Sequence, residues 1–513
     1  MQLSRRTFNG MLGSSLAGSL LGPFGAGFAR AQTKPLTVAL EEIPKQLDPL
    51  RYLTNPGYRV MYNIYDTLLD VDFKKDGALK PALASSWKRV DEKTIDVTLR
   101  DGVLFHDGSP LTVDDVLFTF STERMFDKAS PGFAVAQQLL STIAKVEAVD
   151  GKTVRVVSKI ADPALELRLT AWGSQIISKS AFQKAGGWDG FARKPVGTGP
   201  FSVVNLSPEE VRLAAFPQYW GGAPSIPTLV YRSSPELSSR IAGLAAGDFD
   251  LIADVPPDQF PAVTRSPNLV IAGGPIASIR VVKFDTRNAA LKDPRVRQAL
   301  GFAIDRAAIV KALWQDLVEI PRGHQLASYG ELYDKNRPAL VYDPDKAKKL
   351  LAAGGYKGEV IPYRIRTNAY GPELATAQIL VSMWNAVGVN IDLQIKENFG
   401  QMLAYPGTGM RNGVDPVLIN DPLFSLWRSY NEAEKDVWSN EDFYKAGHVL
   451  ESSMDPAERK KAMGQMLDIF DADPPSIILH TMGLFYGMNK KVKWTPYKHV
   501  YMDFRKENAS IAT

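Results

Sequence analysis

From Pro81 to Phe120 the chain reads PALASSWKRVDEKTIDVTLRDGVLFHDGSPLTVDDVLFTF, and this stretch predicts a strand, a turn and a capped helix. Residues 94–99 alternate polar and apolar side chains, which is the period of a half-buried strand. An Asp-Gly pair follows as a turn signal. Thr112 and Asp115 have the spacing of a capping box, and the apolar stripe behind them predicts an amphipathic helix. The stretch is therefore typical of an α/β protein.

The same run resembles the signature of the extracellular solute-binding protein family 5, the peptide, dipeptide and nickel receptors of ABC importers. The segments that carry the resemblance are LASSW from Leu83, TIDVTLRDG from Thr94, VLFHDGS from Val103 and LTVDDV from Leu111. The resemblance implies an α/β fold of the type II periplasmic-binding-protein kind. Such a fold has two lobes around a ligand cleft, and here an extra domain is inserted in the first lobe. Within it, we expect His106 to shape a turn rather than to catalyse.

Matching segments elsewhere extend the resemblance over nearly the whole chain after residue 31. They are LDP at 47–49, PVGTGPF at 195–201, YWGG at 219–222 and FDTRNAALKDPRVRQAL from Phe284. The glycines of PVGTGPF predict a tight turn rather than a phosphate loop, because no phosphate-binding spacing and no following helix signal accompany them. The domains expected on this basis are lobe I at 32–77, 195–283 and 484–513, the inserted domain at 78–194 and lobe II at 284–483.

The first 31 residues are expected to be an export signal. SRRTFNG at 4–10 carries the paired arginines of a twin-arginine signal. A Gly-rich, weakly apolar stretch follows, and 29–31 form an AxA cleavage site. Glycines and Pro23 disfavour the alternative, an N-terminal membrane anchor. We therefore expect cleavage after Ala31 and a periplasmic protein.

Composition is consistent with a freely diffusing globular protein. The 513 residues are enough for roughly three domains. Three of the 60 basic residues, Arg5, Arg6 and Arg30, lie in the signal, which leaves 57 against 56 acidic residues and gives no reason to expect nucleic acid as a partner. The absence of cysteine excludes disulfides, thiolate metal sites and a lipidated N-terminal cysteine. We expect a monomer that is not lipidated.

The sequence contains no convincing catalytic constellation. The five histidines are scattered and none has HExxH spacing, and there is no GxSxG elbow or EF-hand loop. We therefore expect no enzymatic activity, no metal and no cofactor. The expected partners are a small-molecule or peptide ligand and the permease subunits of an ABC importer in the inner membrane. Two alternatives stay open: a periplasmic hydrolase on the same scaffold, and a chaperone or sensory co-receptor without import.

The resemblance also implies where ligand is held. Peptide-binding members commonly use a second-lobe arginine for the carboxylate, and Arg366 in YRIRTNAYGPELA lies near that place, with Arg364 on the same side. A guanidinium suits a carboxylate because its planar fork donates two parallel hydrogen bonds. Residues around Phe133 and Trp172 correspond to segments that face the cleft in relatives. The ligand-binding residues expected on these grounds are Arg366, Asn368, Tyr370, Asp421, Trp172 and Phe133.

One element of the peptide-binding pattern is missing. In relatives an aspartate for the α-amino group precedes an Asp-Pro pair by three residues, in a GWxxDxxDP pattern, and alignment on Asp421 and Pro422 places Leu418 there. Asp415 or Asp421 takes that role only if the loop shifts. The simple peptide anchor is therefore in doubt, and ligands without a free α-amino group are candidates, such as an opine, a modified peptide or a sugar derivative.

Overall fold

The computed structural model of the protein describes residues 34–51, 54–75, 77–367 and 371–512. The expected signal with its cleavage site after Ala31 lies outside these ranges, as do Asn368 and Tyr370. Residues 35–513 form one unit. Within the described ranges, no helix combines the length and the hydropathy needed to span a bilayer.

A ten-stranded mixed sheet forms the backbone of both lobes. In spatial order its strands are β14 (Ile391–Ile395), β13 (Ile361–Ile365), β15 (Met410–Pro416), β12 (Leu269–Phe284), β16 (Ser476–Asn489), β11 (Leu251–Ile252), β1 (Leu36–Leu40), β10 (Thr228–Ser233), β9 (Glu210–Ala215) and β8 (Phe201–Leu206). All five residues of β1 are buried and it pairs in parallel with two neighbours. A strand buried on both faces is the expected centre of an α/β lobe, which explains its continuous apolar character.

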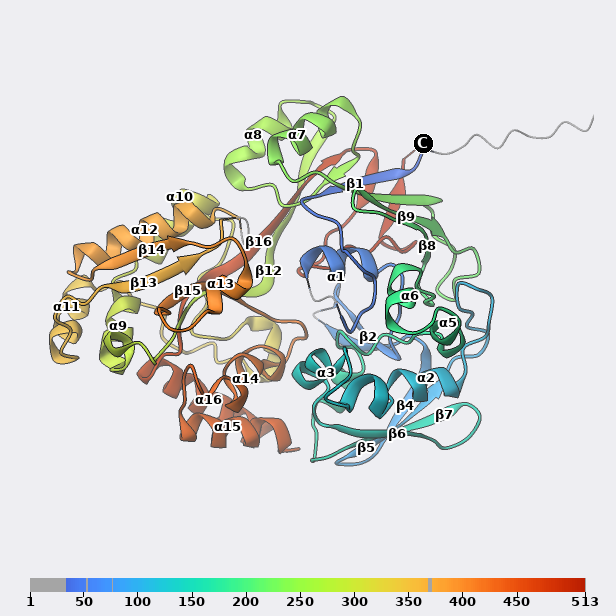
Figure 1. The fold of residues 1–513 in the computed structure, drawn as a ribbon, viewed down its shortest axis with the longest axis horizontal. Helices are drawn as coiled ribbons and strands as arrows, with labels where there is room; N and C mark the ends of the chain where they lie inside the picture. The colour runs from blue at the N-terminus through green and yellow to red at the C-terminus, as the bar shows by residue number, and fades with distance from the viewer. Residues whose placement is uncertain (1–33, 52–53, 76, 368–370, 513) are drawn as a thin grey trace, which may run out of the picture. The chain divides into compact units, whose positions relative to one another are not determined.

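Strands β12 and β16 belong to both lobes, and Figure 1 shows them running between the part that holds β1 and the part that holds β13. They pair antiparallel from Leu269 opposite Asn489 to Lys283 opposite Ser476. The register shifts between Ile276 and Ile279 and again after Arg280. Such bulges leave residues unpaired and bend the strand. The two lobes are therefore connected by two strands whose hydrogen-bond register shifts where they pass from one lobe to the other.

The inserted region contains a separate antiparallel sheet with the strand order β4-β5-β7-β6. Its strands are β4 (Ala84–Asp91), β5 (Thr94–Leu99), β6 (Ile143–Ala148) and β7 (Thr153–Ser158). Helix α2 (Val113–Thr119) begins after Thr112, whose backbone NH donates to Asp115 Oδ2 at 3.0 Å. This is the reciprocal bond of a capping box. The strand, the turn and the capped helix predicted from the sequence are confirmed.

His106 joins the inserted region to lobe I. Its Nε2 lies 3.0 Å from Gly199 O, and the backbone NH of Gly197 donates to its Nδ1 at 3.3 Å. Burial lowers the pKa of His106, which keeps the ring neutral. A Cβ added at Gly197 would lie 2.1 Å from Ile64 O, so only glycine allows this close approach. The tight turn predicted at residues 195–201 is confirmed, and two hydrogen bonds hold His106 against it.

Helices cover the sheets, and the side chains of Asp293 and Asp343 cap two of them. The helices are α1 (Asn55–Met61), α3 (Phe133–Leu139), α4 (Leu165–Arg168), α5 (Lys179–Lys184), α6 (Trp188–Arg193), α7 (Leu237–Ala246), α8 (Phe260–Thr264), α9 (Pro294–Phe302), α10 (Arg306–Trp314), α11 (Pro344–Ala353), α12 (Glu373–Ala386), α13 (Phe399–Leu403), α14 (Leu426–Tyr430), α15 (Glu441–Ser452) and α16 (Pro456–Ala472). Two small sheets complete the fold, β2 (Leu69–Asp72) with β3 (Ala78–Pro81) and β17 (Val492–Trp494) with β18 (Ala509–Ile511).

The hydrophobic core divides into two large clusters. One joins lobe I and the inserted region to α14, α15 and α16. The other lies within lobe II, where α9, α11 and α12 cover β13, and its largest fully buried side chain is Trp384. Trp384 Nε1 donates to Leu300 O at 2.9 Å, which satisfies the buried indole. Each lobe is therefore packed well enough to keep its side of a cleft in place.

Candidate ligand cleft

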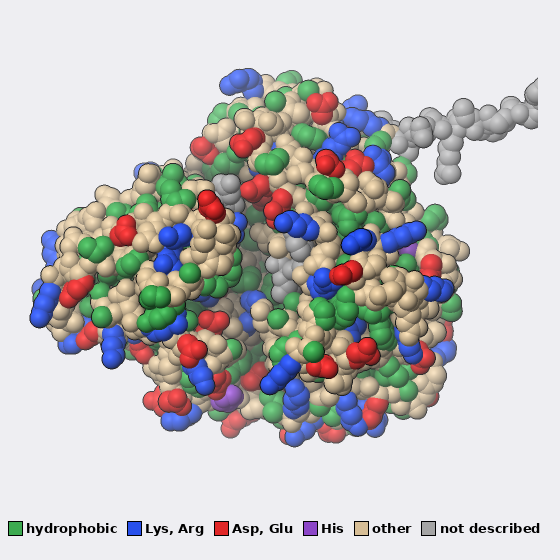
Figure 2. All heavy atoms as spheres, in the orientation of Figure 1, with side chains coloured by type: hydrophobic (Ala, Val, Ile, Leu, Met, Phe, Trp, Pro, Cys, Tyr) green, Lys and Arg blue, Asp and Glu red, His purple; other side chains and the backbone are tan. Residues whose placement is uncertain are grey.

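A cleft of about 820 Å³ lies between the lobes. Helices α1 and α3 line one side, and β15, the segment after it and α14 line the other. The crossing strands contribute Ile276 and Met482. Figure 2 shows the surface hollowed between the two halves. The volume lies within the range of roughly 300–1,000 Å³ that is typical of small-molecule sites.

Aromatic and apolar side chains form part of the cleft wall. Tyr58 comes from α1, Trp427 from α14 and Leu418 from the segment after β15. Burial raises the pKa of Tyr58 to about 12, so its hydroxyl stays neutral and remains a hydrogen-bond donor. Flat rings of this kind provide contact area at a low entropy cost and tolerate varied ligands.

Asp415 is a fully buried carboxylate in the cleft wall, and its charge is already balanced. Lys283 Nζ lies 2.7 Å from Oδ1, and His324 Nε2 lies 2.9 Å from Oδ2. The hydroxyl of Tyr430 donates to Oδ2 at 2.5 Å. Burial alone raises the pKa of Asp415, but Lys283 and His324 outweigh it and hold the pKa well below its usual range. Asp415 is therefore ionised and fully engaged within the wall.

Lys283 and Arg411 are direct cross-strand partners on β12 and β15. Like charges placed opposite each other in this way repel. The stem of Lys283 lies along Gly413, where an added Cβ would be 3.5 Å from its Cγ and 3.6 Å from its Cε, and so its ammonium reaches Asp415. Among the described residues the guanidinium of Arg411 has no hydrogen-bond or ion-pair partner. The strand pairing thus leaves a cationic group facing the cleft.

Arg428 is a second cation in the cleft wall. It lies on the short helix α14, which is fixed by the buried side chains of Leu426, Trp427 and Tyr430. Its Nη2 donates to Gln138 Oε1 at 2.8 Å, whereas its buried Nε has no partner. Burial lowers the pKa of Arg428, and the nearby Tyr58, Asp415 and Glu434 offset this only in part. The guanidinium therefore retains donors for a ligand.

The acidic groups of the cleft are paired or exposed. Glu432 lies 2.6 Å from His448 Nε2, and Glu451 lies 3.3 Å from Arg168 Nη2. Glu434 is exposed at the cleft edge. Among the described residues no group of three or more His, Asp or Glu side chains is arranged to hold a metal ion.

Two of the aromatic residues expected to bind ligand do not line the cleft. Trp172 is 1% exposed, and its Nε1 donates to Pro49 O at 2.8 Å. It packs edge-on against Tyr58, with ring centroids 4.6 Å apart. Phe133 is half-buried and begins α3, whose later residue Gln137 lines the cleft. Trp172 therefore lies behind the cleft wall, whereas a ligand role for Phe133 stays a prediction.

Two of the polar residues expected to bind ligand, Asp421 and Arg366, are not part of the cleft lining. Asp421 Oδ1 accepts a hydrogen bond from Leu423 N at 2.9 Å, and its Oδ2 lies 2.8 Å from Arg459 Nη2. These contacts cap a short helical turn and neutralise the carboxylate. Arg366 is half-buried and follows the end of β13, and Arg364 donates to Ala404 O at 2.6 Å. A ligand role for Arg366 stays a prediction.

The sequence does not single out Arg411 and Arg428 as residues of the cleft wall. Alternation in MRNGVDP places Arg411, Gly413 and Asp415 on one face of a strand. Nothing in that pattern identifies Lys283 as the partner, because the two strands are more than 100 residues apart in the chain. Arg428 follows Leu426 and Trp427 at the start of a helix. An arginine after two apolar residues is by itself typical of an ordinary surface residue.

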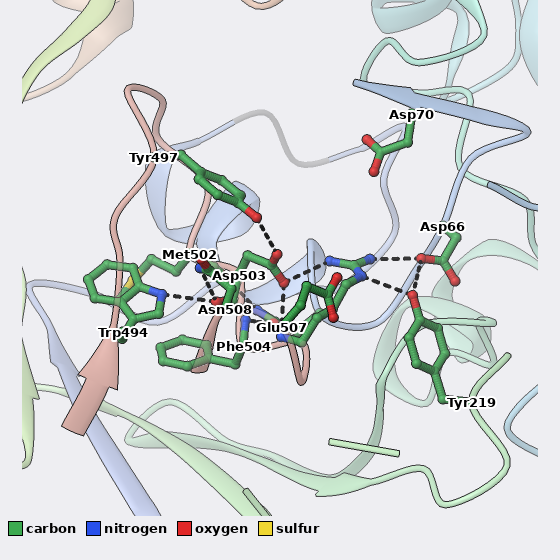
Figure 3. A network of polar contacts seen from close by, with 12 residues as sticks. Asp66, Asp70, Tyr219, Trp494, Tyr497, Met502, Asp503, Phe504, Glu507 and Asn508 are labelled. Atoms are coloured by element: carbon green, nitrogen blue, oxygen red, sulfur yellow. Dashed lines mark hydrogen bonds and ion pairs between the residues drawn. The ribbon is translucent and has the colours of Figure 1, made fainter. Parts of the chain in front are cut away.

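A second cavity of about 250 Å³ lies in lobe I beside a buried charge network. Arg505 Nη2 lies 2.7 Å from Asp66 Oδ1, its Nη1 lies 3.0 Å from Asp503 Oδ1, and its Nε donates to Tyr219 OH at 2.9 Å. Figure 3 shows Asp66 and Tyr219 on one side of this network and Asp503 with Tyr497 on the other. One arginine thus neutralises two buried carboxylates, and these groups hold the C-terminal segment in lobe I.

Packed aromatic rings separate the second cavity from the cleft. Tyr501 stacks on Tyr62, with centroids 4.6 Å apart, and on His499, with centroids 4.0 Å apart. Tyr62 and Tyr501 line the smaller cavity, whereas His499 lines the cleft. Leu418 lines both cavities. Leu418 occupies the position at which relatives carry an aspartate for the ammonium group. This position is therefore an apolar part of the partition between the two cavities.

Replacing His499 with glutamine is expected to reduce the acid sensitivity of folding. Burial lowers the pKa of His499 from 6.5 to about 4. Between these values the unfolded state binds more protons, so stability is present above pH 6.5 and falls as the pH drops. We expect His499 to account for a loss of about 2 kcal/mol between pH 7 and pH 5. Urea unfolding of the wild type and of His499→Gln at both pH values measures the difference. His448→Gln is the matched control because that ring is exposed, and an equal change in both variants would contradict the prediction.

Comparison with known proteins agrees with this architecture. Residues 78–432, more than half of the chain, match the model of the bacterial extracellular solute-binding proteins, family 5 Middle. Di/tripeptide-binding protein 2 of Pseudomonas aeruginosa (strain UCBPP-PA14) is 26% identical over 511 residues, which cover 92% of this chain and 94% of that protein. The periplasmic binding protein DppA of Helicobacter pylori, solved with the peptide STSA, has a similar fold, with a TM-score of 0.82 at 22% identity over 93% of this chain and 98% of that one.

A second solved structure shares the fold and holds a different class of ligand. The binding protein AgaA of A. tumefacien R10, in complex with agropinic acid, matches with a TM-score of 0.80 at 24% identity, covering 93% of this chain and 99% of that one. The predicted type II two-lobed fold is confirmed by these neighbours. Family members are binding proteins rather than enzymes. The chain belongs to family 5 of the bacterial extracellular solute-binding proteins.

Proposed function

We propose that the protein captures a small solute, a peptide or a peptide-like or opine-like compound, and delivers it to the permease subunits of an ABC importer. The cleft of about 820 Å³ between the lobes carries this proposal, because both lobes and the inserted region contribute to its wall. A ligand that touches both sides favours the closed arrangement by its differential affinity. A permease that recognises only that arrangement would then receive loaded protein.

The chain acts as a periplasmic, non-lipidated monomer on this proposal, exported by its twin-arginine signal and cleaved after Ala31. The relative from Pseudomonas aeruginosa, which covers 92% of this chain, supports a role in solute binding. The absence of cysteine supports a soluble rather than a lipid-anchored form.

A binding role without catalysis fits the polar groups of the cleft better than a hydrolase does. The buried His324 and Asp415 have the contact that a catalytic pair needs, but Asp415 also binds Lys283 and Tyr430. His324 is fully buried and does not line the cleft. A general base must reach the proton that it removes, and His324 has no such access.

Thermal unfolding of the mature protein with a panel of solutes tests the proposed function. The panel contains di- and tripeptides, N-acylated peptides, opines, sugars and metal salts. A solute at 100 times its dissociation constant is expected to add about 2.7 kcal/mol to the free energy of unfolding. Mass spectrometry of each stabilising solute after incubation is expected to recover it unchanged, with one molecule bound per chain. Conversion of a bound solute to product would favour the hydrolase alternative. Uptake that survives deletion of the protein would favour the chaperone or co-receptor alternative.

A further inference from the structure

In the cleft wall, neither Arg411 nor Arg428 forms an ion pair with a described residue, and Asp415 and Glu434 act on Arg428 only from beyond ion-pair distance. Arg411 has no polar partner among the described residues, and it lies opposite Lys283 in the strand ladder. Arg428 Nε is buried without a partner. Leaving a buried charged donor unpaired is costly, and a charge-assisted hydrogen bond to an anion removes that cost. Both groups therefore favour an anionic ligand.

Among the described residues of the same wall, the buried anion is Asp415, and its charge is already paired. Asp415 is engaged by Lys283, His324 and Tyr430. Leu418 presents an apolar surface nearby. Glu434 is ionisable but exposed to solvent, where a single ion pair is worth little. A free ammonium would therefore lose its hydration without gaining a buried partner.

A side chamber next to the cations indicates a further property of the ligand. A cavity of about 170 Å³ beneath α13 shares Lys283, Arg411 and Glu434 with the cleft. Its remaining lining combines the apolar side chains of Met402, Leu403, Phe284, Met410 and Val437 with Thr408 and with the ion pair of Asp285 and Arg287. An apolar group bound there would lie beside a carboxylate held by Arg411. A pocket that is apolar with a few convergent polar groups is the common form of a small-molecule site.

We propose that the cleft selects a carboxylic acid that lacks a free ammonium group, with its carboxylate at Arg411 and Arg428 and an apolar substituent in the chamber beneath α13. This assignment rests on the proposed function, since it specifies what the same cleft binds. The two arginines lie on different elements, β15 and α14. Planar guanidinium groups bind carboxylates through paired hydrogen bonds, which lysine does not provide.

Three matched probes separate the parts of this recognition. They are N-acetyl-alanyl-leucine, its parent alanyl-leucine with a free ammonium, and N-acetyl-alanyl-leucinamide, which lacks the carboxylate. Isothermal titration of the mature protein is expected to show binding of the first probe and at least about tenfold weaker binding of the other two. A tenfold loss corresponds to about 1.4 kcal/mol, which is within the range for one lost charged hydrogen bond.

Four variants locate the recognition within the cleft. Arg411→Gln and Arg428→Gln are each expected to weaken binding of N-acetyl-alanyl-leucine at least about tenfold. Arg428→Lys is expected to recover little, because an ammonium lacks the planar fork. The matched control is Arg295→Gln, which removes a half-exposed guanidinium outside the cleft lining and is expected to change the affinity by less than about twofold. Thermal unfolding without a probe checks that each variant is folded.

Each outcome of these titrations decides the assignment. Tighter binding of alanyl-leucine than of its acetylated form would overturn the assignment and leave the proposed function intact. Unchanged affinity of Arg411→Gln and Arg428→Gln for N-acetyl-alanyl-leucine would also overturn the assignment and leave the proposed function intact. If N-acetyl-alanyl-leucine gives no binding at millimolar concentration, the assignment is wrong. If in addition no solute of the thermal-unfolding panel binds, the proposed function is wrong as well.

Discussion

Replacing Arg505 with methionine is expected to lower the free energy of unfolding by about 3–5 kcal/mol. The substitution keeps most of the side-chain volume but removes the charge between Asp66, which is 6% exposed, and Asp503, which is 2% exposed. Both carboxylates would then be buried without their cation. Breaking a buried ion pair from one side is costly because the remaining charge keeps its desolvation penalty.

Urea unfolding at pH 7 measures the effect, and Arg295→Met is the matched control. Arg295 also pairs with an aspartate, Asp293, at 2.6 Å, but this pair is largely exposed. We expect the control to cost no more than about 1 kcal/mol. Adding Asp66→Asn to Arg505→Met is expected to restore part of the lost stability by removing one of the stranded charges. A loss below 1 kcal/mol in Arg505→Met would show that water already screens this network.

Replacing Trp172 with alanine is expected to cost about 3–5 kcal/mol, the usual range for removing a fully buried aromatic side chain. The indole is 1% exposed and packs against Tyr58 and Tyr501, with centroids 4.6 Å and 5.9 Å away. It also donates to Pro49 O at 2.8 Å. The variant loses this packing, and it leaves a buried carbonyl without its donor.

The variant also tests the expectation from sequence that Trp172 contacts ligand. Because Trp172 lines the smaller cavity and Tyr58 lines the cleft, removing the indole is expected to loosen the partition between them. Trp172→Phe, which keeps a ring but not the donor, is expected to retain most of the stability and most of the affinity for N-acetyl-alanyl-leucine. A variant that is as stable as the wild type yet no longer binds would instead support direct ligand contact.

Local structure was predictable where neighbouring residues determine it. The strand at 94–99 and the cap at Thr112 and Asp115 follow from alternation and from a fixed three-residue spacing, and both are confirmed. The close approach at Gly197 was also expected, because glycines between rigid residues permit it. These features depend on contacts within a few residues or on the backbone alone.

The cleft residues were less predictable because they depend on pairing between distant strands. Lys283 meets Arg411 only through the register of β12 and β15, and it reaches Asp415 only because residue 413 has no side chain. Composition and periodicity do not encode that register. Asp421 is an example of the opposite case, a residue that the sequence favours as a ligand anchor and that the fold pairs with Arg459 instead.

The register shifts in the pairing of β12 and β16 lie at other residues than the arginines proposed to select the ligand. Any change of angle between the lobes must bend both strands, and bending is least costly where the ladder already shifts register, between Ile276 and Ile279. The arginines that distinguish ligands lie elsewhere, at Arg411 and Arg428. The resistance of β12 and β16 to bending is therefore set by backbone geometry and does not depend on which ligand is bound. Altering the arginines would retune selectivity while leaving the mechanics of closing intact.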